Sequence, residues 1–268
     1  MYLIKMVANS GVIVKPMPQA AVKYKQSRYD LPRLPMRCMI VGRSAAGKGS
    51  LIASMLQEQY AGCFEAIYVF ASTAEVDPLW IALVKYIHGT LGQARDVKDL
   101  DDIAIAHSTI DEGVIRKILA KGERSLKRQK AEGKKLVKGT LLVFDDMSHT
   151  PALQKHQAEI MAETFTASRH YSCSLIYSVH SVTSLGSLPR RQLSCLILFP
   201  DSNRRSYESL SEQYSRLAGP DKKTFDDIYQ LALGKDGPPY SFLVINANER
   251  PGRIFMLLFS DFIVPETD

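Results

Sequence analysis

The sequence feature that most constrains the fold is a short glycine-rich loop between an apolar run and a helical pattern. Residues 42–50 read GRSAAGKGS and match the pattern G-x-x-x-x-G-K. Residues 36–41 are mostly apolar and predict a buried parallel strand, and residues 47–59 carry apolar side chains on one helical face. In such a strand–loop–helix unit the backbone N–H groups of the loop cradle phosphates. The sequence therefore predicts an α/β fold built around a phosphate-binding loop.

Each part of this loop has a physical role in binding a nucleotide. Gly42 and Gly47 allow a tight turn and a close approach of the backbone to a ligand. Lys48 supplies positive charge for the β- and γ-phosphates, and the following helix presents its positive end. We therefore expect the phosphates of a nucleoside triphosphate to bind along the whole loop: Gly42, Arg43, Ser44, Ala45, Ala46, Gly47, Lys48, Gly49 and Ser50.

A second apolar strand, predicted over residues 140–144, ends in two carboxylates, Asp145 and Asp146. A carboxylate at the tip of a neighbouring strand can hold the Mg²⁺ that bridges the β- and γ-phosphates, and we assign this role to Asp145. Asp146 is then placed to orient or deprotonate an attacking water. The alternative interpretation is that the pair caps an ordinary helix.

Two further positions bear on the metal and phosphate contacts of this site. The residue after Lys48 is Gly49 rather than the Ser or Thr that usually ligates the metal, so Ser50 is the candidate hydroxyl ligand. His180 closes another predicted strand, and the carboxyl ends of parallel strands form the ligand-binding edge of a sheet. His180 is therefore a candidate sensor of the γ-phosphate, although a single histidine is as often structural.

The rest of the chain alternates between predicted strands and helices. The strands fall at residues 65–72, 172–179, 193–199, 240–246 and 253–259, and a helix starts at Asp77-Pro78. Further helices are predicted at residues 111–133, 151–169, 203–217 and 222–233. This alternation predicts a mostly parallel sheet with helices on both faces. Residues 1–35, interrupted by prolines, are expected to be an N-terminal basic arm, and residues 36–268 one domain.

Several classes of protein are excluded by composition. No apolar run approaches the ~20 residues that a membrane-spanning helix needs. Lys5 interrupts the first apolar stretch, so neither a membrane span nor a secretory signal is expected. The four cysteines lie far apart without a C-x-x-C pair, which indicates buried thiols rather than a zinc site or a disulfide framework.

The net charge of +6 is unevenly distributed along the chain. Residues 1–50 carry nine basic residues and one acidic residue, and residues 116–138 carry ten basic and two acidic ones. The other two segments, residues 51–115 and 139–268, are acidic overall. This segregation favours a polyanionic partner such as nucleic acid, the alternative being a solvated helix face and a basic arm.

The order of the motifs resembles the viral genome-packaging ATPases of the FtsK/HerA superfamily, the poxvirus-type group. The resemblance covers residues 36–200 and rests on four blocks: GRSAAGKGS, LLVFDDM, SRHYSCSLIYSVHS and SLPRRQLSCLILF. Family members carry an Arg-His-like pair, a strand, a polar sensor and then an arginine before the next strand. The sensor is usually Gln, whereas this chain has His180.

This resemblance implies an additional-strand P-loop NTPase fold, RecA/FtsK-like, over residues 36–268, with residues 116–138 as a basic insertion. It also implies hydrolysis of ATP with Mg²⁺, assembly of a homo-oligomeric ring, and translocation of double-stranded DNA into a capsid. Arg190 or Arg191 would be the arginine finger that acts on a neighbouring subunit, with Arg169, Arg204 and Arg205 as alternatives. A viral capsid protein would be a partner. The protein would then work in the host-cell cytoplasm or nucleus, or with the virion, and would not be secreted.

Two other functions remain compatible with the sequence. The run Lys48-Gly49-Ser50 resembles the G-K-G-T of adenylate kinase-like enzymes, so a nucleotide kinase is one alternative. A non-catalytic scaffold that binds nucleotide and DNA is the other, because Gly49 and His180 depart from the usual pattern. A GTPase is less favoured, since no N-K-x-D-like segment is present.

Overall fold

The structure, a computed structural model, describes residues 22–93, 103–147, 156–201, 203–219, 222–234 and 237–265. Residues 1–21 of the expected arm and 151–155 of one expected helix lie outside these ranges. The strands are β1 (Arg37–Val41), β2 (Phe64–Ala71), β3 (Ala106–His107), β4 (Gly139–Asp145), β5 (Cys173–Val179), β6 (Cys195–Leu198), β7 (Leu243–Asn246), β8 (Phe255–Leu257) and β9 (Asp261–Ile263). The α-helices are α1 (Lys48–Ser54), α2 (Pro78–Leu91), α3 (Glu112–Ala131), α4 (His156–Ala167), α5 (Ser187–Arg191), α6 (Arg204–Ala218) and α7 (Lys222–Leu233).

These strands form one sheet in the order β3-β2-β4-β5-β1-β6-β7-β8-β9. All pairs from β3 to β6 are parallel, and the last three pairs are antiparallel. The mostly parallel sheet predicted from the alternation of elements is confirmed. Strand β5 lies between β1 and β4, so the additional strand is present. The acid pair therefore follows the second neighbour of β1, not an adjacent strand as the sequence suggested.

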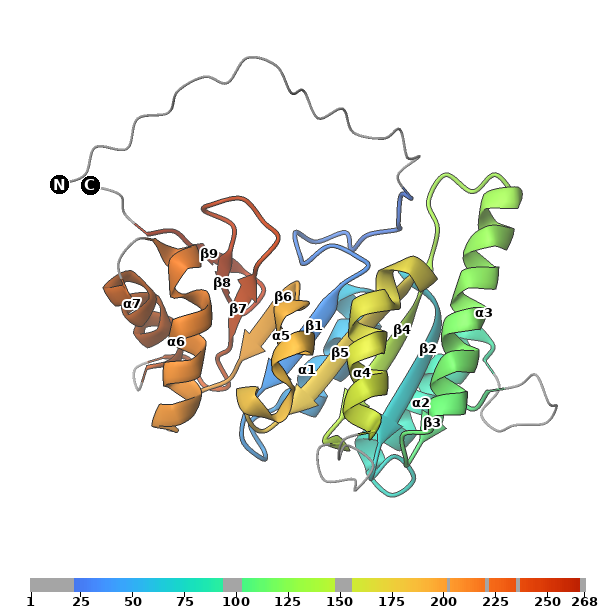
Figure 1. Cartoon of the computed structure of the whole chain (residues 1–268), viewed down its shortest axis with the longest axis horizontal. Helices are drawn as coiled ribbons and strands as arrows, with labels where there is room; N and C mark the ends of the chain where they lie inside the picture. The colour runs from blue at the N-terminus through green and yellow to red at the C-terminus, as the bar shows by residue number, and fades with distance from the viewer. Residues whose placement is uncertain are drawn as a thin grey trace, which may run out of the picture.

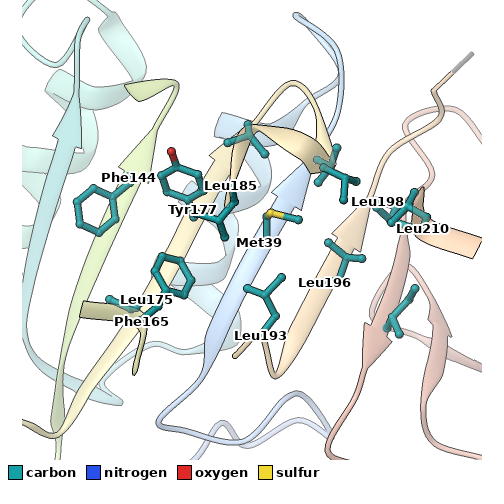
Figure 2. Close-up of a cluster of buried hydrophobic side chains, with 14 of the residues drawn as sticks. Met39, Phe144, Phe165, Leu175, Tyr177, Leu185, Leu193, Leu196, Leu198 and Leu210 are labelled. Carbon is teal, nitrogen blue, oxygen red and sulfur yellow. The ribbon is translucent and has the colours of Figure 1, made fainter. Parts of the chain in front are cut away.

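Helices cover both faces of the sheet (Figure 1). Helices α1 and α2 pack on one face, where Ile52, Leu56 and Trp80 join a buried cluster. Helices α3, α4 and α6 lie on the other face, where Figure 2 shows side chains from β4, β5, β1 and β6 meeting Phe165 of α4 and Leu210 of α6. All four cysteines are buried and free, as expected. None of the helices within the described ranges is long and apolar enough to cross a membrane.

Several elements differ from the sequence-based expectation. The short strands β3 and β9 and the five-residue helix α5 were not predicted, because elements of so few residues show no measurable periodicity. The helix predicted over residues 47–59 is α-helical only to Ser54 and continues as a π-helical turn at Met55–Gln59. The basic segment 116–138 contains most of α3, and this helix belongs to the core because Ile118 and Leu119 are buried.

The described part of the arm, residues 22–35, packs against the domain. Leu31 and Leu34 are buried with α1 and α2, and the Tyr60 hydroxyl donates to the Pro32 carbonyl at 2.8 Å. Tyr24 also forms a parallel bridge with Val137, just before β4. The arm thus closes the amino-terminal edge of the sheet, opposite the edge at which the phosphate loop lies (Figure 1).

We expect alanine substitutions at two helical glycines to have opposite effects on stability. A Cβ atom on Gly122 of α3 would lie 2.6 Å from the Tyr171 carbonyl oxygen, whereas one on Gly89 of α2 would meet nothing within 4 Å. We expect Gly122→Ala to lower the free energy of unfolding by about 1–3 kcal/mol. Gly89→Ala should raise it by about 0.5–1 kcal/mol, since alanine is the better helix former. Urea unfolding of both variants measures this, and equal effects would contradict the close packing of α3.

Candidate active site

The phosphate loop and the acid pair line one cavity of about 820 Å³ at the carboxyl edge of the sheet. Residues 44–51 form one wall of it, and Asp145, Asp146 and His180 form another. The remaining lining comes from Ser72 and Thr73 after β2, from the start of α2, and from three aromatic residues near β6 and β7. The sites predicted separately from distant parts of the sequence therefore belong to one place in the fold.

The backbone of the loop requires its glycines. Gly47 has a φ of 99°, in the left-handed region that favours glycine, and it precedes the first turn of α1. A Cβ atom on Gly42 would lie 2.8 Å from Cβ of Phe199, so no larger residue fits there without a shift. The first N–H groups of α1 have no partner within the helix and point into the loop. These groups form an anion-binding cradle.

Lys48 is buried beneath this loop, with 8% of its surface exposed. Its ammonium donates to the carbonyls of Gly42 at 2.8 Å and Arg43 at 3.1 Å, and lies 3.4 Å from Nδ1 of His180. Burial lowers the pKa of Lys48, and the charges of Asp145 and Asp146 oppose this shift. The ammonium group therefore lies between the loop carbonyls and His180.

Asp145 lies at the end of β4, on the face that α1 and α2 cover. Burial raises the pKa of its carboxyl group, and Ser178, Lys48 and the indole of Trp80 oppose the rise while Asp146 adds to it. Ser178 is paired with Asp145 across β4 and β5, and its hydroxyl is buried beside that carboxyl group. Asp145 is thus a partly shielded carboxylate with a hydroxyl oxygen beside it.

Asp146 turns away from the strand and faces His180. Its φ is 48°, a conformation that Asp adopts more readily than most residues, and its N–H donates to the Ser178 carbonyl at 3.2 Å. Nε2 of His180 lies 3.1 Å from Oδ2 of Asp146. Nδ1 of the same ring lies 3.4 Å from the Lys48 ammonium and 3.3 Å from the Gly42 carbonyl oxygen. An ammonium only donates and a carbonyl only accepts, so Nδ1 can pair with either group according to whether it carries a hydrogen. His180 therefore links the lysine to the second carboxylate.

Several solved structures are similar to this chain in fold. The genome packaging NTPase B204 from Sulfolobus turreted icosahedral virus 2 matches with a TM-score of 0.53 and 16% identity, over 83% of this chain and 95% of that one. The DNA-packaging ATPase B204 from Sulfolobus turreted icosahedral virus matches at 0.52 and 15%, over 87% and 98%. The pCW3 conjugation coupling protein TcpA matches at 0.50 and 11%, over 80% of this chain and 58% of that one.

The chain therefore shares the fold of these proteins, a mostly parallel α/β sheet with the phosphate loop directly after β1. No protein-family model and no curated protein sequence matches it. At these identities the comparison supports the arrangement of the chain, and the chemistry must be argued from the residues of the cavity.

The donors around Asp145 fit a magnesium ion. Mg²⁺ is usually held by one or two carboxylates together with waters and substrate phosphates, so a complete protein cage is not required. Asp145 supplies the carboxylate, and the Ser50 hydroxyl lines the same cavity. Within the described residues no group of three or more His, Cys, Asp or Glu forms a metal cage.

Gly49 leads to a test of this metal assignment. A Cβ atom at Gly49 would lie 3.6 Å and 3.7 Å from the Leu79 methyl groups, an ordinary contact, so a side chain fits. We expect Gly49→Ser to lower the Mg²⁺ concentration needed for half-maximal ATP hydrolysis several-fold, because it adds a hydroxyl ligand. Gly49→Ala is the matched control for helix propensity. An equal shift in both variants would contradict a ligand role for this position.

The two candidate arginine fingers do not line the cavity of their own chain. Arg190 of α5 donates to Oγ of Ser209 on α6 at 3.3 Å, and its buried Nε has no partner among the described residues. Arg191 is exposed. Arg169 and Arg205 are also exposed, and the side chain of Arg204 lies outside the described residues. An arginine finger from any of them needs a neighbouring subunit, and this role stays a prediction.

Sequence analysis missed several residues of the cavity. Trp80 is 1% exposed and contacts Asp145, and Ser178 lies beside the same carboxylate. Phe199, Tyr240 and Phe242 form the end of the cavity away from Asp145. No motif marks these residues, since their contacts follow from the sheet order. Asp77 was predicted only as a helix cap, and it does accept from the Leu79 N–H at 2.9 Å.

Proposed function

We propose that the chain is an ATP-hydrolysing motor that translocates double-stranded DNA. We further propose that this DNA is a viral genome and that the motor packages it into a capsid. The observation that carries this proposal is the cavity in which the phosphate loop, Lys48, Asp145, Asp146 and His180 meet. The fold shared with two proteins named as packaging enzymes supports the same conclusion. We also propose a homo-oligomeric ring, because the finger arginines lie outside their own site.

The residues divide the hydrolysis of ATP between them. The loop N–H groups and Lys48 bind the phosphates, and Asp146 accepts a proton from the attacking water. His180 contacts Lys48 through Nδ1 and Asp146 through Nε2, and so fixes the positions of both side chains. A magnesium ion held by Asp145 and Ser50 would neutralise charge on the β- and γ-phosphates.

The basic segments of the sequence supply a surface for DNA. Val137 donates to the Lys23 carbonyl at 2.9 Å, and Lys25 donates its N–H to the Val137 carbonyl at 2.8 Å. Burial raises the pKa of the Cys63 thiol, and Lys25 and Lys138 both oppose this rise, so both ammonium groups lie near it. We call this surface the basic edge: Lys23, Lys25, Lys130, Lys135 and Lys138. Among the described residues none of its members pairs with a carboxylate, whereas Lys127, Arg128 and Lys134 do.

The basic edge predicts a salt-dependent interaction with DNA phosphates. We expect the triple change Lys23→Gln, Lys130→Gln and Lys135→Gln to weaken DNA binding and to reduce the slope of log K against log salt by about 0.9 per lost contact. The control is the same charge change at Lys85, Arg216 and Lys222, which are exposed elsewhere. Fluorescence anisotropy at several salt concentrations measures both slopes, and equal slopes would place the DNA elsewhere.

Phosphate release with and without duplex DNA tests the proposed function. Stimulation of ATP hydrolysis by duplex DNA is expected of a motor. Transfer of phosphate to a nucleoside monophosphate would instead identify a kinase, and DNA binding without hydrolysis would identify a scaffold. Negative-stain images of the protein with ATP and DNA would test the ring. Localisation to the host cytoplasm, the nucleus or the virion belongs to the same proposal.

A further inference from the structure

The nucleotide cavity has two ends of different chemistry. Its acidic end lies at β4 and β5, where Asp145, Asp146 and His180 are found. Its aromatic end lies on the other side of the phosphate-loop strand, where Phe199 follows β6, and Tyr240 and Phe242 precede β7. The strand order β4-β5-β1-β6-β7 separates these ends, with the loop between them. A nucleoside triphosphate has the same polarity, with anionic phosphates at one end and a flat ring at the other.

The aromatic rings contact the loop itself. A Cβ atom on Gly47 would lie 3.7 Å from Cε1 of Phe199 and 3.9 Å from Cδ1 of Tyr240. Phe199 is 3% exposed, and its ring centroid lies 5.6 Å from that of Phe242, which packs at 5.1 Å against Phe259. Phe199 and Phe242 therefore form a fixed support, and Tyr240 remains the ring that is free to meet a ligand.

Tyr240 is held in an arrangement that folding alone does not explain. The residue is 75% exposed, so it contributes little buried apolar surface. Its φ is 57°, in a region that costs a non-glycine residue free energy, within a turn where Ser241 donates to the Pro238 carbonyl at 3.1 Å. An exposed aromatic ring, held beside a phosphate loop by a strained backbone, fits a role in ligand binding.

We propose that Tyr240, supported by Phe199 and Phe242, is a nucleobase-binding subsite that holds the base by stacking and does not read its edge. Neither Asn nor Gln lines the cavity within the described residues. Asp145 ends β4, which β5 and β1 separate from β6 and Phe199, and the Asp77 carboxylate caps the first turn of α2. Stacking tolerates any base, because each has a π-face. The site therefore accepts GTP as well as ATP. This inference rests on the proposed binding of nucleotide and adds its base specificity.

The first test separates the contribution of the base to binding from that of the phosphates. Isothermal titration with Mg²⁺ compares a non-hydrolysable ATP analogue with inorganic triphosphate, in the wild type and in two variants. Tyr240→Asn removes the ring but keeps a residue that adopts positive φ readily, and Tyr240→Phe keeps the ring. We expect Tyr240→Asn to bind the analogue about 5- to 150-fold more weakly, the range given by the loss of one stacked ring, with triphosphate unchanged. Tyr240→Phe should bind both as the wild type does.

The second test measures base selectivity in the wild type. Non-hydrolysable analogues of ATP and GTP should bind within about tenfold of each other, because no edge is read. A preference above about 100-fold would overturn the proposal, as would an unchanged affinity of Tyr240→Asn for the ATP analogue. An equal loss of analogue and triphosphate in Tyr240→Asn would also overturn it, since the loop itself would then be damaged. Failure of the wild type to bind triphosphate would overturn nucleotide binding as well.

Discussion

Lys48→Ala is expected to reduce ATP hydrolysis by at least about 10²–10³-fold, the loss typical of removing one preorganised charge-stabilising group. Lys48 is buried, and its ammonium is within reach of the loop carbonyls and of His180. The change also removes the positive charge that lowers the pKa of Asp145. A phosphate-release assay at saturating ATP and Mg²⁺ measures the effect.

The matched control for this variant is Lys85→Ala, which removes an exposed lysine of α2. It should hydrolyse ATP at the wild-type rate. Thermal unfolding of both variants shows whether the Lys48 effect is separate from stability. Hydrolysis by Lys48→Ala within tenfold of the wild type, in a folded protein, would contradict the role of this loop.

Asp146→Asn is expected to lower turnover by about 10²–10⁴-fold and to leave ATP binding largely unchanged. The amide has nearly the same shape as the carboxylate, and its oxygen can still accept from Nε2 of His180, which lies 3.1 Å from Oδ2. What is lost is the group that takes a proton from water. Phosphate release and isothermal titration with an ATP analogue separate the two effects.

Asp145→Asn is the matched comparison for Asp146→Asn, because it tests the metal-binding role rather than the proton-accepting role. It removes the carboxylate assigned to the metal, so Mg²⁺-dependent nucleotide binding should weaken. If the two variants behave the other way round, with binding lost in Asp146→Asn and retained in Asp145→Asn, the two roles are exchanged.

Much of the site was predictable because its signals are local. The strand–loop–helix unit around Gly42 and Lys48 is contiguous, and the acid pair directly follows an apolar run. His180 was placed at the same edge because parallel strands end together. Its contacts with both Lys48 and Asp146 were not predictable, since they depend on β5 lying between β1 and β4.

The basic edge illustrates the same limit. The two positive segments are visible in the sequence, but their meeting depends on the bridge between Tyr24 and Val137. Of the lysines in the second segment, Lys127 and Lys134 are paired with carboxylates, whereas Lys130 and Lys135 have no such partner among the described residues. Only the folded chain distinguishes lysines whose charge is already compensated from those available to DNA.

The sequence by itself determined the kind of fold, because strands and helices alternate along the chain. It also determined the phosphate loop and the two carboxylates, because each is a run of consecutive residues. The tertiary structure alone decided which strand separates the loop from the acid pair. It also placed Tyr240 beside Gly47, and brought residues of the arm to the end of α3. The physical reason is that such contacts join residues far apart in the chain, and their positions follow from the order of strands in the sheet and the packing of side chains between layers.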